Sequence, residues 1–176
     1  MTAPDALVLF RALAGIPVFI LITADQPILA LALFVIAALS DALDGFLARR
    51  SGTAGPRGAL LDPLADKFLV VMALAGLAST GQVPAVFAQL VALREGAVAV
   101  LRVIAYRRHL LTGTGLAAKI KTALELVAIA LLMLGRPPAP VSDAGVLLLA
   151  LALAIGLATL PMYVPRNGTS LRDASR

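Results

Sequence analysis

Four aspartates within a short stretch form the part of the chain best suited to chemistry. Asp41 and Asp44 are three residues apart, and Asp62 and Asp66 are four apart, so each pair would share one face of a helix. Apolar sequence flanks these residues, and a carboxylate beside hydrocarbon is costly unless it has a partner. Carboxylate oxygens are ligands that Mg²⁺ or Mn²⁺ accepts. We therefore predict that two helices place the four carboxylates around divalent metal.

A divalent metal held by carboxylates could also bind the oxygens of a phosphate substrate. Two divalent cations would balance four carboxylates and let a phosphate substrate approach. Asp41, Asp44 and Asp62 are the expected metal ligands. Asp66, one helical turn after Asp62, can border the metal and reach an incoming hydroxyl. The alternative is a transporter or channel that uses the carboxylates as a cation pathway, but that function would spread acidic residues across the membrane depth.

Composition indicates a membrane protein. The 176 residues are 60% hydrophobic, well above the roughly 45–50% of soluble domains. Cysteine is absent and His109 is the single histidine, which excludes disulfides, zinc–thiolate sites and histidine-cluster sites. The net charge of +5 comes from basic residues in loops between apolar segments, so we expect no nucleic-acid partner.

We predict an all-α integral membrane protein, a single domain over residues 1–176 with six transmembrane helices. Each span needs about 20 apolar residues. The predicted spans are Ala6–Ile22, Pro27–Leu47, Pro63–Ser79, Val83–Tyr106, Ala117–Leu134 and Ala144–Tyr163. Basic residues concentrate on one side of these spans, which the positive-inside rule makes cytoplasmic. Both termini and the four aspartates should therefore face the cytosol.

The aspartates belong to a longer pattern, Asp41-x2-Asp44-Gly45-x2-Ala48-Arg49-x8-Gly58-x3-Asp62-x3-Asp66. It resembles the signature of the CDP-alcohol phosphotransferase family, membrane enzymes that move a phosphatidyl or related group from a CDP-linked donor to an alcohol and release CMP. Eight specified residues at fixed spacing make this match far more specific than a lone glycine-rich motif. The resemblance also implies that Asp66 is the general base, that the enzyme is a homodimer, and that it lies in a bacterial cytoplasmic membrane.

The resemblance further suggests contacts to the cytidine diphosphate donor. It assigns Gly45 and Arg49 to this group, although a membrane-surface anchor is the alternative for an arginine at the end of a span. Gly58 is also expected at the donor site, and as a glycine it lets the chain re-enter the membrane tightly. Asp5, just before the first span, either caps that helix or contacts the donor head group.

Basic residues further along the chain predict a pocket for an acceptor phosphate: Arg94, Arg102, Lys119 and Lys121. This region resembles the subfamily whose donor is CDP-diacylglycerol and whose acceptor is sn-glycerol 3-phosphate. Arg94 could instead pair with Glu95 or Glu125, and the two lysines could instead be cytosolic anchors. Phosphatidylglycerol, as in cardiolipin synthases, and inositol phosphate remain alternative acceptors. Lys67, directly after Asp66, is expected only to balance charge or reach the surface.

Overall fold

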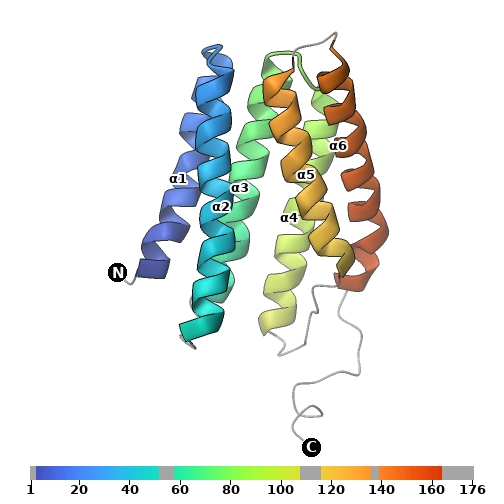
Figure 1. The fold of residues 1–176 in the computed structure, drawn as a ribbon. Coiled ribbons are helices and arrows are strands. Elements are labelled where there is room, and N and C mark those ends of the chain that lie inside the picture. Colours follow the sequence, from blue (N-terminus) through green and yellow to red (C-terminus); the bar gives the residue numbers. More distant parts are fainter. Residues whose placement is uncertain (1–2, 52–57, 108–115, 136–138, 164–176) are drawn as a thin grey trace, which may run out of the picture.

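The computed structural model describes residues 3–51, 58–107, 116–135 and 139–163, and within them the side chains of 13–40, 67–101, 103–104, 116–135 and 139–161. These residues form helices and no strands. The elements are α1 (Ala3–Thr23), α2 (Pro27–Ser51), α3 (Gly58–Ser79), α4 (Ala85–Arg107), α5 (Leu116–Leu134), α6 (Pro140–Thr159) and a short 3₁₀ helix, η1 (Leu160–Tyr163). Figure 1 shows one bundle in which successive helices run up and down alongside one another.

The all-α prediction is confirmed, because each of the six predicted apolar segments coincides with one helix of the bundle. Three helices are several residues longer than predicted. α1 spans Ala3–Thr23 instead of Ala6–Ile22. α2 continues beyond Leu47 to Ser51, and α3 begins at Gly58 instead of Pro63. The longer α2 and α3 matter because they place the whole aspartate pattern, except residues 52–57, on helical backbone.

Small residues let the helix backbones approach closely. A Cβ atom added at Gly15 of α1 would lie 3.0 Å from Cδ1 of Phe68 in α3. A Cβ atom at Gly145 of α6 would lie 2.7 Å from Cγ of Leu132 in α5. These two contacts occur in the helix pairs that pack most extensively, α1 with α3 and α5 with α6. Packing of this kind suits helices in lipid, where close van der Waals contact drives association.

The outer surface of the described part of the bundle carries many large apolar side chains. Large apolar side chains point outward on several helices, including Ile28 (75% exposed), Leu93 (71%) and Leu147 (71%). Helices that are apolar on all sides belong in a membrane or in the interior of a large protein. Within the described part of the chain, α6 alone is long and apolar enough to cross a membrane, and the other apolar stretches are shorter.

Candidate active site

The aspartate pairs lie at the same end of the bundle. Asp41 and Asp44 are in the C-terminal half of α2, and Asp62 and Asp66 are in the first turns of α3. Residues 52–57 connect these two helix ends, which lie at the bottom of Figure 1. Because the backbone is helical at all four positions, each pair shares a helix face, as the spacing predicts. The aspartate side chains lie outside the described residues, so their role as metal ligands stays a prediction.

The donor set nevertheless fits a hard divalent cation. Four carboxylates from two neighbouring helix ends offer only oxygen ligands, which Mg²⁺ and Mn²⁺ prefer over nitrogen or sulfur. Among the side chains that the structure describes, no group of three or more acidic, histidine or cysteine residues could hold a metal ion. The four aspartates are not among those side chains and remain the candidate ligands.

The predicted donor-binding residues are placed by their backbone only. Gly45 and Arg49 lie on α2, and Gly58 is the first residue of α3. Asp5 lies inside α1, two residues after its start at Ala3, and not at the position before the helix that a cap requires. Arg102 lies in α4, and its side chain is likewise outside the described set.

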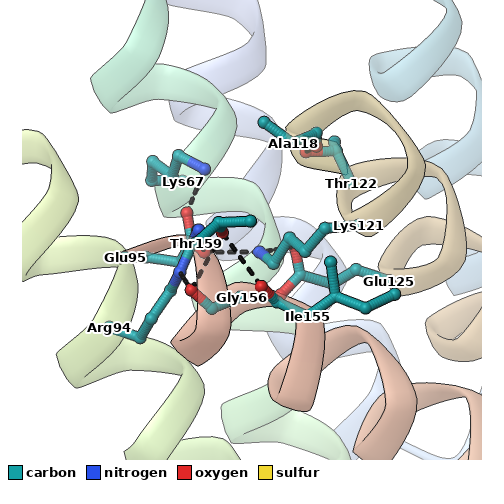
Figure 2. Close-up of polar contacts among 10 residues, drawn as sticks. All are labelled: Lys67, Arg94, Glu95, Ala118, Lys121, Thr122, Glu125, Ile155, Gly156 and Thr159. Carbon is teal, nitrogen blue, oxygen red and sulfur yellow. Dashed lines mark hydrogen bonds and ion pairs between the residues drawn. The ribbon is translucent and has the colours of Figure 1, made fainter. Parts of the chain in front are cut away.

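Two of the predicted acceptor residues meet in the interior instead, in a group that we name the buried charge cluster. It consists of Lys67 of α3, Arg94 and Glu95 of α4, and Lys121 and Glu125 of α5 (Figure 2).

Glu95 is the centre of this cluster. Its Oε1 accepts a hydrogen bond from Arg94 Nη1 at 2.5 Å and another from Lys121 Nζ. Its Oε2 forms an ion pair with Lys67 Nζ. Lys121 Nζ also donates to Glu125 Oε2 at 2.5 Å, so one ammonium group joins the two carboxylates. Glu95 therefore connects three helices through one carboxylate.

The cluster is shielded from solvent except at one residue. Glu95 is 1% exposed and Lys121 is 2% exposed, whereas the side chain of Lys67 is 20% exposed. Three cations and two carboxylates give the cluster a net charge of +1. Removing ions from water costs several kcal/mol each, and close pairing offsets much of that cost. Lys67, which sequence reasoning assigned no binding role, is thus the part of the cluster nearest to solvent.

α6 completes the cluster. Arg94 Nε donates to the carbonyl oxygen of Gly156 at 3.3 Å, near the C-terminal end of α6, where the helix dipole favours a cation. A Cβ atom at Gly156 would lie only 3.0 Å from Arg94 Nε, so a side chain here would displace the guanidinium group. The absence of a side chain at this position leaves room for Arg94.

The structure thus separates the three predicted acceptor residues whose side chains it describes. Arg94 pairs with Glu95, one of the two pairings that the sequence left open. Lys121 is buried in the cluster and not a surface anchor, while Lys119 is exposed on another side of α5. Sequence reasoning missed the contacts that Glu95 makes with Lys67 and Lys121. It also missed the pair of Lys121 with Glu125, although these two residues have the spacing of a helical ion pair.

Comparison with known proteins adds independent evidence. The family described as CDP-alcohol phosphatidyltransferase matches residues 1–158. A protein of Mycobacterium tuberculosis H37Rv named probable phosphatidylglycerophosphate synthase is 38% identical over 146 residues, which are 83% of this chain and 68% of that protein. The CDP-diacylglycerol–glycerol-3-phosphate 3-phosphatidyltransferase of Escherichia coli K12 is 33% identical over 97% of each chain.

These matches agree with the aspartate pattern, since they include α2, α3 and the connection between them. A membrane location, metal dependence and transfer of a phosphatidyl group fit the same assignment. The chain is an enzyme that belongs to the CDP-alcohol phosphatidyltransferase family.

Proposed function

We propose that the enzyme transfers the phosphatidyl group of CDP-diacylglycerol to sn-glycerol 3-phosphate and releases phosphatidylglycerophosphate and CMP. The observation that carries this proposal is the pair of aspartate motifs on the adjoining ends of α2 and α3, in a chain that aligns over 97% of its length with a relative named for this reaction. A second relative, 38% identical, carries the name of the same product.

The aspartates would divide the work of the reaction. Asp41, Asp44 and Asp62 would hold one or two Mg²⁺ or Mn²⁺ ions, which, when bound, neutralise and polarise the donor pyrophosphate. Asp66 would take the proton from the acceptor hydroxyl as its oxygen attacks the phosphorus nearest the lipid. The bond between that phosphorus and the oxygen bridging to CMP then breaks, and CMP leaves with the bridging oxygen. Gly45, Arg49, Gly58 and Asp5 would position the donor.

The acceptor phosphate would bind near the basic residues of α4 and α5. Lys119 is exposed and can contact a dianion directly. Arg102 is proposed for the same role. Arg94 and Lys121 are already paired with glutamates. They would therefore contribute through the net positive charge of the buried charge cluster, or through direct contact after a change of partner.

We further propose that all six helices cross a bacterial cytoplasmic membrane, with both termini and the aspartates on the cytosolic side. The apolar outer surface of the bundle and the concentration of basic residues at one side support this topology. A homodimer is proposed from family resemblance.

One experiment tests donor, acceptor and metal together. The purified protein is incubated in detergent micelles with CDP-diacylglycerol, Mn²⁺ and one of several acceptors, and CMP release is measured. We expect CMP with sn-glycerol 3-phosphate and far less with glycerol, inositol phosphate or phosphatidylglycerol. Equal or faster release with another acceptor would move the chain to another branch of the family, and no release with any acceptor would refute the proposed function.

A further inference from the structure

We propose that Glu95 is a positioning residue for the reaction, because its carboxylate holds Lys67, the neighbour of Asp66, against α4 and α5. This inference rests on the proposed function, in which Asp66 is the general base. It assigns a role to Glu95 and Lys67 that the aspartate pattern does not contain.

The first argument is the geometry of the Glu95 carboxylate. Its two oxygens have different partners: Oε2 contacts Lys67 of α3, while Oε1 contacts Arg94 and Lys121. Figure 2 shows the Lys67 side chain extending from α3 toward Glu95, with Lys121 on the other side of the carboxylate. One buried side chain therefore fixes α3 relative to α4 and α5 at the height of Lys67.

The second argument is the position of Lys67 in α3. Lys67 and Asp66 are consecutive residues of one helix, so their Cα atoms are about 3.8 Å apart on a rigid backbone. A rotation or axial shift of this turn of α3 moves both residues together. A general base has to lie within hydrogen-bond reach of the proton it removes, and a displacement of about 1 Å can lower a rate by about 10²-fold.

The third argument is that stability alone explains the cluster poorly. Apolar side chains of similar volume are often as stabilising as a buried ion network, and apolar residues fill the rest of this interior. Leucine and alanine fill most of this interior, and they could have replaced the five charged groups without loss of stability. We therefore infer that the charged groups fix the relative positions of the helices. Glu95 contacts Lys67, the residue after Asp66, so the position of Asp66 is the part of the site that the buried charge cluster would fix.

Glu125 offers a matched control. Glu95→Gln and Glu125→Gln are both isosteric changes at buried carboxylates, and each raises the net charge of the cluster from +1 to +2. Only Glu95 contacts Lys67, whereas Glu125 contacts Lys121. A purely electrostatic role predicts similar changes of kcat in the two variants, because the change of charge is the same. A purely structural role predicts a lower melting temperature, with the larger loss in Glu95→Gln because Glu95 has three cationic partners, but no selective loss of kcat. A positioning role predicts a loss of kcat that is confined to Glu95→Gln.

The experiment measures kcat and both KM values by CMP release, together with the melting temperature of each variant in the same detergent. We expect Glu95→Gln to lower kcat by about 10²-fold while the KM for CDP-diacylglycerol stays within about threefold of wild type. Glu125→Gln should also lose thermal stability but keep kcat within about threefold.

A second variant keeps the test decisive if Glu95→Gln does not fold. Lys67 is partly exposed, so Lys67→Met removes the same contact at a more tolerant position. Lys67→Met should reproduce the loss of kcat, and Lys67→Arg, which keeps the positive charge, should retain much of the wild-type kcat. The double variant Lys67→Met with Glu95→Gln should have a kcat no lower than either single variant. An active wild type whose kcat survives Lys67→Met, or falls equally in Glu95→Gln and Glu125→Gln, overturns the inference alone. A wild type that releases no CMP with any acceptor overturns the proposed function and the inference with it.

Discussion

Replacing Lys121 with methionine should destabilise the folded protein far more than the same change at Lys119. Lys121 is 2% exposed, and its ammonium group contacts both Glu95 and Glu125. Glu95 keeps Arg94 and Lys67 as partners after the substitution, but Glu125 loses the cation that it contacts. Breaking a buried pair by removing one partner costs roughly 3–5 kcal/mol, because a buried charge remains uncompensated.

The predicted difference is large enough for a thermal measurement. For a chain of this size, 1 kcal/mol corresponds to about 2–4 °C, so Lys121→Met should lower the melting temperature by roughly 6–20 °C. Lys119→Met makes the same chemical change two residues away on an exposed position, and should cost no more than about 0.5 kcal/mol.

A third variant identifies the cause of the loss. Lys121→Met combined with Glu125→Gln removes the uncompensated carboxylate and should recover part of the lost stability, since a neutral amide is less costly to bury than a charge. Melting temperatures of Lys121→Met and Lys119→Met that agree within experimental error would refute the reasoning. So would a double variant that is less stable than Lys121→Met.

The remaining predictions concern the reaction. Excess chelator should abolish CMP release, and added Mg²⁺ or Mn²⁺ should restore it; full activity in a metal-free preparation would contradict the mechanism. Asp66→Asn should lower kcat by about 10²–10⁴-fold while metal and donor binding persist, whereas Asp41→Asn should weaken metal binding, measurable by titration calorimetry. Arg49→Ala should raise mainly the KM for the donor, and Arg102→Ala mainly that for glycerol 3-phosphate, each by roughly 10- to 150-fold for a lost contact of about 1.5–3 kcal/mol. The reverse pattern of KM changes would show that the two arginines are assigned to the wrong substrates.

The order and number of the helices could be predicted because the signal is local. Apolar segments of nearly uniform character alternate with short turns, such as the one at Gly81, whose φ of +76° favours glycine. The start of α3 was predicted less accurately than the order of the helices. The predicted span starts at Pro63, but the helix already begins at Gly58, and Ala59, Leu60 and Leu61 before the proline are residues of high helix propensity.

In the candidate site too, local features could be predicted from the sequence and contacts between distant residues could not. The aspartate spacings are local, and they describe positions on helices that the structure confirms. The contacts of Glu95 with Lys121 and of Arg94 with Gly156 join residues 26 and 62 positions apart, so no periodicity in the sequence contains them. Only the tertiary arrangement of α4, α5 and α6 reveals which charges meet.

A cation within an apolar helix has two ways to be compensated: a negatively charged ligand, or a carboxylate of the same chain. Both use the same residue types, so the sequence around Arg94 and Lys121 could predict a phosphate pocket and ion pairing equally well. The structure shows that Glu95 and Glu125 compensate these two cations internally. The cluster nevertheless keeps a net charge of +1, and Lys119 lies exposed on the same helix as Lys121. Internal pairing and attraction of an anionic acceptor are therefore compatible, because the carboxylates reduce the positive charge of this region without cancelling it.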